Sequence, residues 1–336
     1  MRIKYTVVIS LFLLLNFKSQ AQNTGQRIKG ITVNCPQDSF IQNPYLEISK
    51  LGANWTCITP YRYCNPNSFD IADHDVFNWW GLNMSGIVHS IKVAKAADLK
   101  IMIKPQLFLE KAWPGIIDFD NESQWLAWEK QYTKFIMQFV DLAIKYNVEL
   151  FCVGTELKNS VQKRNDFWEN LIVKIRSQYD GKIIYSANWD NYKEVKFWTS
   201  LDYIGISSYF PLSESKNAVP KKLKNSWKPI KRKLINFAYK KGKKIVFTEY
   251  GYLSVDGCAN KHWENEDNIK YLSVNETAQA NALVSLYQSF WHEKIWVGGF
   301  LWKWYPDRKG HNDYFEKDYT LQGKKAEEVI KNWFSK

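Results

Sequence analysis

The sequence predicts an α/β fold, namely a single (β/α)8 TIM barrel with extended βα loops. Short β-rich runs recur between helix-length segments from Ile28 onward, as in βα units around a parallel sheet. There are eight such runs, and no glycine-rich phosphate fingerprint follows the first of them. A doubly wound open sheet also alternates strands and helices. Eight units without that fingerprint favour the closed barrel.

The amino-terminal residues have the pattern of an export signal. Two basic residues precede an apolar run from Val7 to Leu15, and small residues precede the expected cleavage site after Ala21. A membrane anchor is the alternative, but the run is shorter than the roughly 20 apolar residues that span a bilayer. We therefore expect residues 1–21 to be a signal peptide, residues 22–336 to form one barrel domain, and the protein to be secreted or periplasmic.

The predicted strands are short and rich in β-branched and aromatic residues. They span Ile28–Val33, Trp55–Thr59, Ile101–Gln106, Leu150–Thr155, Lys182–Ala187, Tyr203–Tyr209, Lys244–Thr248 and Val297–Trp304. Several segments that follow strands are long and aromatic, whereas the segments before strands are short. The segment Leu253–Leu272, which contains Trp263, is an example. This asymmetry indicates that the functional site lies at the carboxyl ends of the strands.

Apolar residues at helical spacing predict helices between the strands. One apolar stripe consists of Ile87, Val88, Ile91 and Ala94, and another consists of Trp128, Phe135, Phe139 and Leu142. The segment from Ser273 to Glu276 has the pattern of a capping box and predicts a helix that runs toward Trp291. Gly181 and Gly242 stand where a helix should stop before the next strand.

The chain is basic, with a formal net charge of +12. Its lysines cluster in Lys221–Lys233 and in Lys240–Lys244, where apolar residues alternate with them at helical spacing. This pattern is typical of the solvated face of an outer barrel helix. A patch for nucleic acid or an acidic glycan is the alternative, but no recognised nucleic-acid motif accompanies the charge. We expect no nucleic-acid partner, no membrane span and a monomer.

The cysteines and histidines do not have the spacing of a metal site. Five cysteines cannot all pair with one another, and Cys152, which lies inside an apolar run, is the one expected to be free. Pairing among the others is left open by the sequence: Cys35, Cys57, Cys64 and Cys258. The histidines include no HExxH motif, so we expect no metal and no cofactor.

Two predicted strands end in a glutamate. Glu156 directly follows Leu150–Thr155, and Glu249 directly follows Lys244–Thr248. A closed barrel brings both carboxylates to the same rim, and glycoside hydrolysis uses such a pair on either side of the scissile bond. One carboxyl group must be protonated and the other ionised. A single strand-end glutamate is more simply a solvated charge, but two at equivalent positions favour catalysis.

Further motifs accompany these glutamates in a specific order. They are Lys104-Pro-Gln106, Trp113-Pro-Gly-Ile116, Val153-Gly-Thr-Glu156-Leu, Ser186-Ala-Asn-Trp189, Tyr203-Ile-Gly-Ile-Ser-Ser-Tyr209, Thr248-Glu-Tyr-Gly251 and Gly299-Phe-Leu-Trp302. Together they resemble glycoside hydrolase family 113 over nearly the whole mature chain. The resemblance implies endo-acting hydrolysis of β-1,4-mannans with retention of configuration. It also implies that Glu156 is the acid/base and Glu249 the nucleophile.

The chain departs from the wider clan of these glycosidases at one position. Many members place an asparagine directly before the acid/base, where it binds the sugar 2-hydroxyl, whereas this chain has Thr155. The contact to the 2-hydroxyl is therefore unassigned, and Asn188 and Lys104 are the candidates for it.

Two residues are candidates to support the charge of Glu249. Alternation along a strand places Tyr209 at the barrel mouth, where its phenol could donate a hydrogen bond to that carboxylate. Arg62, just beyond the second strand, could stabilise the same charge. The alternatives are a packed aromatic ring for Tyr209 and a surface cation for Arg62.

Sixteen tryptophans are many for one chain, and sugar rings stack on indole planes. Those in predicted helices are expected to pack against the barrel. They are Trp125, Trp128, Trp168, Trp198, Trp291 and Trp333. Those at strand ends or in βα loops could bind sugar, namely Trp113, Trp189, Trp263, Trp302 and Trp304. Trp302 is the first choice, because it ends the last strand beside the first.

The predicted function is hydrolysis of a polysaccharide or oligosaccharide. A β-glucan, a xylan or a host glycan could replace mannan in the same barrel with the same two glutamates. A carbohydrate-binding barrel without catalysis is an alternative of another class, and the presence of both Glu156 and Glu249 argues against it. Nucleases and nucleotide enzymes are disfavoured, because the metal cluster and the P-loop are missing.

Overall fold

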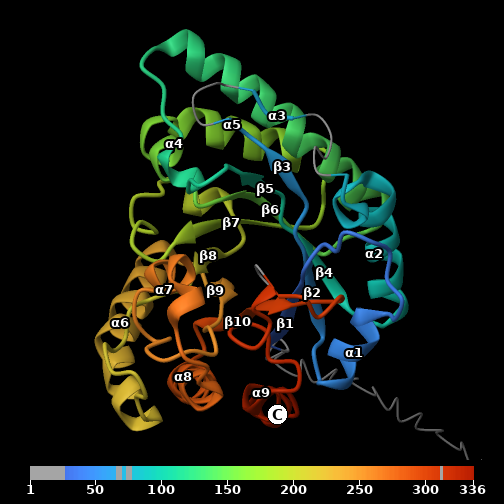
Figure 1. Ribbon diagram of the computed structural model, residues 1–336. Coiled ribbons are helices and arrows are strands. Elements are labelled where there is room, and N and C mark those ends of the chain that lie inside the picture. The colour runs from blue at the N-terminus through green and yellow to red at the C-terminus, as the bar shows by residue number, and fades with distance from the viewer. Residues whose placement is uncertain (1–26, 66–69, 73–77, 311–312) are drawn as a thin grey trace, which may run out of the picture.

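The computed structural model describes residues 27–65, 70–72, 78–310 and 313–336. Eight parallel strands close into a barrel in the order β1-β10-β9-β8-β7-β6-β4-β2, and helices surround it (Figure 1). The predicted (β/α)8 barrel is confirmed. The open sheet is excluded, because β1 pairs with both β10 and β2. The predicted signal peptide lies outside the described residues.

All eight predicted strands are present. The barrel strands are β1 (Ile28–Val33), β2 (Trp55–Ile58), β4 (Lys100–Ile103), β6 (Leu150–Thr155), β7 (Lys182–Asn188), β8 (Ile204–Ser207), β9 (Ile245–Tyr250) and β10 (Trp296–Trp304). Bounds agree with the prediction for β1 and β6 and differ by a few residues elsewhere.

Beyond the barrel, β3 (Tyr61–Tyr63) and β5 (Gln106–Phe108) form a separate two-stranded parallel sheet. The predicted third strand therefore divides in two. Pro60 and Pro105 lie at the two breaks, where each lacks the N–H that would continue the ladder. This small sheet extends the chain above the carboxyl ends of β2 and β4.

Nine α-helices lie within the described residues. They are α1 (Pro44–Lys50), α2 (Met84–Ala96), α3 (Glu122–Lys145), α4 (Lys158–Lys163), α5 (Asn165–Arg176), α6 (Pro220–Lys241), α7 (His262–Asp267), α8 (Glu276–Phe290) and α9 (Lys325–Phe334). The 3-10 helices of the same part of the chain are η1 (Trp80–Leu82), η2 (Pro114–Ile116), η3 (Phe197–Ser200) and η4 (Ile269–Tyr271). None of these helices combines the length and the apolar character needed to cross a bilayer.

The helices bury the faces that the sequence predicts. The predicted stripes lie in α2 and α3, which bury Ile91 and Phe139 against the core. In α6, Trp227 and Leu234 are buried, while most of the lysines around them are exposed. The lysines of α6 therefore form the solvated face of an outer helix, as predicted, whereas Lys243 and Lys244 lie beyond its end.

The predicted helix ends are only partly correct. The prediction of a capping box that begins at Ser273 is wrong, because Asn275 caps α8. The Asn275 side chain accepts a hydrogen bond from the Ala278 N–H at 2.9 Å. Ser273 lies two residues before that cap. Gly242 ends α6 with a left-handed φ of 64°, as glycine allows. Gly181 is not a helix cap, because α5 ends at Arg176 and the chain continues before β7 begins.

The interior of the barrel is a packed core rather than a channel. Its lower layer consists of Ile28, Cys57, Met102, Leu150, Cys152, Ile184, Val246 and Phe300. A second cluster fills the space between the strands and the helices. It contains the predicted packing residues Trp125, Trp128, Trp168, Trp198 and Trp291, all buried, with Trp333 partly buried against them.

All five cysteines are buried and free, so Cys35, Cys57, Cys64 and Cys258, whose pairing the sequence left open, form no disulfide in this structure. Cys152 lies in the barrel interior, as its apolar run predicts.

Candidate active site

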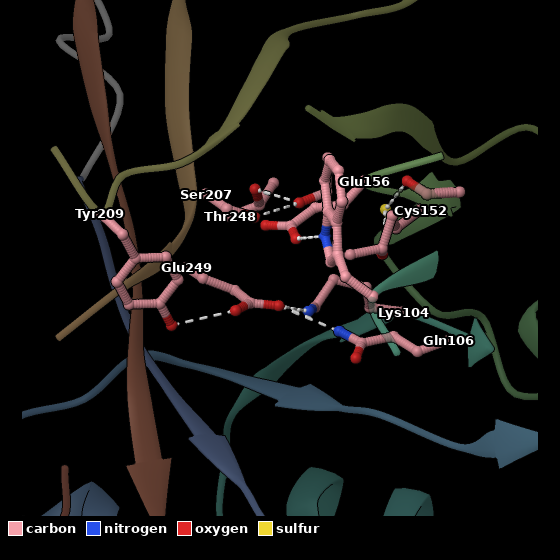
Figure 2. A network of polar contacts seen from close by, with 12 residues as sticks. Lys104, Gln106, Cys152, Glu156, Ser207, Tyr209, Thr248 and Glu249 are labelled. Carbon is pink, nitrogen blue, oxygen red and sulfur yellow. Dashed lines mark hydrogen bonds and ion pairs between the residues drawn. The ribbon is translucent and has the colours of Figure 1, made fainter. Parts of the chain in front are cut away.

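Glu249 lies next to the last residue of β9, inside the mouth of the barrel, and is only 7% exposed. Its Oε1 accepts hydrogen bonds from the Lys104 ammonium group and, at 3.0 Å, from the Gln106 amide (Figure 2). Its Oε2 accepts one from the Tyr209 hydroxyl at 3.0 Å. Three donors from two other regions of the chain thus stabilise a negative charge on Glu249 and hold it in one orientation.

Lys104 follows β4 and is fully buried. Burial alone would lower the pKa of its ammonium group, but the neighbouring Glu249 carboxylate raises that pKa above its ordinary value. The two side chains form a buried ion pair. Removing either partner would leave an uncompensated buried charge, which strongly destabilises a folded protein.

Tyr209 lies two residues beyond β8 and is 8% exposed. Burial, together with the Glu249 carboxylate, raises the pKa of its phenol well above the ordinary value. The hydroxyl therefore keeps its proton and acts as a donor. The ring also stacks on His262 of α7, with 4.3 Å between the ring centroids. The hydrogen bond to Glu249 that the sequence suggested is present.

Glu156 directly follows β6 and has a left-handed backbone, with φ at 56°. Residues other than glycine rarely adopt this conformation, and such strain concentrates at functional sites. The Glu156 N–H still donates to the Ser186 carbonyl on the neighbouring strand at 2.8 Å. The Oε2 of its carboxyl group accepts a hydrogen bond from the Trp113 indole at 2.6 Å.

The environment of Glu156 favours the protonated acid. Burial, and then the negative charge of Glu249, raise its pKa to about 7, while hydrogen bonds from Trp113 and Ser207 oppose the rise. Near neutral pH, Glu156 can therefore hold and release a proton, whereas the groups around Glu249 stabilise its carboxylate. Two carboxyl groups in one site are thus prepared for different tasks.

Both glutamates line the same cavity, whose volume is about 220 Å³. Its wall comes from the small β3–β5 sheet and the segment after it, and its lining includes Tyr61, Gln106, Phe108 and Pro114. A larger and more open depression of about 480 Å³ lies over α3 and α5 and includes neither glutamate. We place the site at the smaller cavity, because its chemistry is there.

The tryptophans predicted to bind sugar have different surroundings. Trp302 is partly exposed, and its ring centroid is 5.0 Å from the Lys104 ammonium nitrogen. Trp189 is partly exposed and lies parallel to Trp263 of α7, at 6.1 Å between centroids. Trp113 contacts Glu156 through its indole N–H.

Trp304 is a correction to the prediction, because it is 4% exposed and packs in the core. The pairing between β1 and β10 shifts between Ile31 and Val33, opposite Leu301 and Trp304. This irregularity breaks the strict alternation of side chains, so Trp302 and Trp304 do not share an environment.

Asn188 and Arg62 form hydrogen bonds with groups other than the two glutamates. The Asn188 side chain accepts a hydrogen bond from the Trp189 N–H at 2.8 Å, at the end of β7. Arg62 is 2% exposed, so it is not a surface cation. It donates to the backbone carbonyls of Tyr61 and Leu82 and lies over the Phe139 ring. The cation paired with Glu249 is Lys104.

Sequence reasoning missed three residues of the site: Gln106, Ser207 and His262. Gln106 lies two residues from Lys104, so strand alternation could have indicated that both reach Glu249. Ser207 lies two residues before Tyr209 and could have been found in the same way. His262 comes from a long loop, and no local pattern indicated its position.

Comparisons with known proteins agree with this arrangement. The family model of Glycoside Hydrolase Family 113 matches residues 46–324. A GH113 β-mannanase from Alicyclobacillus acidocaldarius is 23% identical, with a TM-score of 0.76 over 92% of this chain and 97% of that one. A GH113 β-1,4-mannanase is 22% identical, with a TM-score of 0.78 over 93% and 99%.

A more distant structure, a β-glucuronidase from Ruminococcus gnavus, is 11% identical, with a TM-score of 0.63 over 92% of this chain and 50% of that one. No curated protein matches the sequence.

Proposed function

Because the chain belongs to glycoside hydrolase family 113, we propose that it hydrolyses β-1,4-mannan or glucomannan with retention of configuration. Glu249 is the nucleophile and Glu156 the acid/base. The observation that carries these roles is the contrast between the surroundings of the two carboxyl groups. One accepts hydrogen bonds from Lys104, Gln106 and Tyr209, and the other has a pKa raised to about 7 by burial and by Glu249.

The reaction has two displacements. In the first, Glu249 attacks the anomeric carbon, the glycosidic bond breaks, and Glu156 gives its proton to the departing oxygen. In the second, Glu156 takes a proton from water, whose oxygen attacks the same carbon and releases Glu249. Lys104 and Tyr209 stabilise the Glu249 carboxylate before the attack and when it leaves again. Glu156 ends the cycle protonated.

The proposed substrate is supported by the solved structures that match over nearly the whole chain, which are described as β-mannanases. Trp302, partly exposed beside Lys104 and Glu249, offers an indole face for a sugar ring. The amino-terminal export pattern fits an enzyme that meets a polysaccharide outside the cytoplasm.

The catalytic roles are tested with Glu249→Ala and Glu156→Ala. We expect each to keep the fold and to lose about 10²- to 10⁴-fold or more in kcat on an activated aryl β-mannoside, because a general acid or a nucleophile is missing. Sodium azide should rescue Glu249→Ala with an inverted glycosyl azide as product. It should rescue Glu156→Ala with a retained one. Glu328→Ala, a change of an exposed glutamate on α9, is the matched control.

Activity like that of the wild type in either variant contradicts the assignment of that glutamate. The substrate is tested separately by incubation with mannan, glucomannan, xylan and cellulose, followed by product sizing. Preferred cleavage of xylan or cellulose would leave the mechanism and overturn the mannan proposal. An intact fold without turnover of any glycan would favour the carbohydrate-binding barrel.

A further inference from the structure

Lys303 is a cation beside the nucleophile that the proposed mechanism does not use. Its ammonium nitrogen lies 4.7 Å from the ring centroid of Trp302 and 5.0 Å from that of Tyr305. The side chain is partly exposed, and no hydrogen bond to its nitrogen is found among the described residues. Burial lowers the pKa of Lys303, although the charges of Asp318, Glu266 and Glu249 oppose this. The group therefore has donors available for a ligand.

The Trp302 ring places Lys303 within reach of the same sugar as Glu249. The ammonium nitrogen of Lys104, which pairs with Glu249, is 5.0 Å from the centroid of the same ring. The two ammonium groups are therefore no farther apart than the sum of their distances to the Trp302 ring. That separation is about the span of one or two sugar rings, so a sugar stacked on Trp302 beside Glu249 can also contact Lys303.

Glu266 of α7 supplies an acceptor in the same region. Its Oε1 accepts a hydrogen bond from the Tyr319 hydroxyl at 2.6 Å, and no bond to its Oε2 is found in the described part of the chain. The centroids of the Tyr319 and Tyr209 rings are 6.1 Å apart, and the Tyr209 hydroxyl donates a hydrogen bond to Glu249. Glu266 is partly exposed, and its charge and that of Lys303 influence each other. One of its oxygens is thus held in place while the other is available.

The charges of this region balance. Glu249 pairs with Lys104, and the charges of Asp318, Glu266 and Glu249 act on Lys303. Asp318 also acts on Lys324: burial lowers the pKa of Lys324 to about 8, and the charge of Asp318 opposes this fall. Each of these three lysines therefore has a carboxylate nearby, and none of them, within the described part of the chain, is left in excess to compensate a carboxylate on the substrate. A ligand with hydroxyl groups and no charge fits this arrangement, whereas a uronic acid would meet two carboxylates.

We propose that Lys303 and Glu266 bind two neighbouring hydroxyl groups of the glycone sugar that stacks on Trp302, and that they select an uncharged sugar. A hydroxyl group both donates and accepts, so a vicinal pair can accept from the ammonium group and donate to the carboxylate. The inference rests on the proposed function, because it assumes that the glycan occupies the cleft beside Glu249.

The experiment uses dinitrophenyl β-mannobioside and analogues in which one glycone hydroxyl at a time is replaced by hydrogen. Lys303→Met keeps the apolar stem over the rings, and Glu266→Gln keeps an acceptor for Tyr319. We expect each to lower kcat/KM on the parent substrate by about tenfold to a hundredfold, the effect of losing a hydrogen bond to a charged group. Lys228→Met, an exposed lysine of α6, is the matched control for lost charge and should behave as the wild type.

The deoxy analogues separate binding from a general structural effect. The wild type should have a low kcat/KM on the analogue that lacks the hydroxyl bound by Lys303, and Lys303→Met should lower that value little further. For the analogue that lacks the neighbouring hydroxyl, the same should hold for Glu266→Gln. Equal losses on the parent and on every analogue would overturn the inference, as would values within twofold of the wild type for both variants. Unfolding temperatures of the variants report whether each is folded.

A second arm tests charge selection. The wild type should cleave dinitrophenyl β-mannoside at least a hundredfold faster than the corresponding uronide, and equal turnover would overturn the selection of an uncharged sugar. The proposed function fails in a different way, namely if the wild type cleaves another neutral β-glycan in place of mannosides. The same variants and deoxy analogues of that glycan then decide the role of Lys303 and Glu266.

Discussion

At the scale of single residues, the two glutamates show how surroundings give one side chain two functions. Glu249 accepts hydrogen bonds from an ammonium group, an amide and a phenol, all of which favour the carboxylate. Glu156 accepts a hydrogen bond from the Trp113 indole in a partly buried position, where burial and the nearby negative charge favour the acid. Strand ends alone would leave the two equivalent, and the neighbours from other strands make them different.

The hydrogen bond from Trp113 predicts a change in pH dependence. This bond lowers the pKa of Glu156, so Trp113→Phe should raise that pKa further. Because the reaction needs the protonated acid, wild-type kcat/KM should fall as pH rises through about 7. In the variant the fall should move to higher pH, and kcat at neutral pH should decrease by about fivefold to tenfold through the lost hydrogen bond.

The control for this prediction is Trp263→Phe, which changes an exposed tryptophan of α7 without a hydrogen bond to Glu156. It can weaken substrate binding but should leave the alkaline limb of the pH profile in place. A Trp113→Phe limb that stays at the wild-type position, or moves to lower pH, would contradict the assigned role of the indole.

At the scale of elements, the breaks at Pro60 and Pro105 build one wall of the site. The chain leaves the barrel after β2 and β4 and pairs again as β3 and β5 above the rim. Gln106 begins β5, and this wall therefore carries a donor to Glu249 as well as part of the cavity lining. A strand prediction that continues through Pro105 misses the separate sheet, because period-two alternation is similar on both sides of the break.

The amino terminus of α8 gives a stability prediction. Asn275 accepts from the Ala278 N–H and also donates to the Asp256 carboxylate at 2.8 Å. Asn275→Ala should lower the free energy of unfolding by about 1 to 2 kcal/mol, because a cap is lost. Ser273→Ala should change it by less than about 0.5 kcal/mol. The measurement is urea denaturation followed by circular dichroism.

Asn275→Ser, which restores a capping oxygen, should recover part of the loss. A cost for Ser273→Ala as large as that for Asn275→Ala would support the capping box predicted from the sequence, and not the cap seen in the structure.

At the scale of the whole molecule, the closed barrel depends on a filled interior. Phe300 of β10 is fully buried in the lower layer, where its ring lies edge-on to Trp55 at 6.2 Å between centroids. Gly30 on the neighbouring strand makes room for this ring, since a β-carbon there would lie 2.4 Å from Phe300 Cδ1. The large residue and the glycine opposite it therefore form one packing unit.

Phe300→Ala should lower the free energy of unfolding by about 3 to 5 kcal/mol, because a cavity replaces the ring. Val173→Ala, on the exposed face of α5, should change it by less than about 0.5 kcal/mol. Chemical denaturation of both variants gives the comparison. Similar values for the two would contradict a tightly packed barrel interior.

Local pattern was sufficient for the order and type of the elements. Buried parallel strands are apolar along their whole length, so Leu150–Thr155 was predicted with its observed bounds. Pattern was insufficient where several groups compete for one interaction, as Ser273 and Asn275 do for the cap of α8. It was also insufficient at the irregularity in β10, where Trp302 and Trp304 were both predicted as sugar-binding residues but Trp304 packs in the core.

The sequence by itself determined the eight-unit barrel and the two strand-end glutamates, because hydrophobic periodicity and turn residues are local properties of a chain. Only the tertiary structure decided which side chains surround those glutamates. Lys104 was predicted as a sugar contact and Arg62 as a support for Glu249, but Lys104 forms the ion pair. Partners of this kind are 145 residues apart in the chain, and only closure of the barrel brings them together.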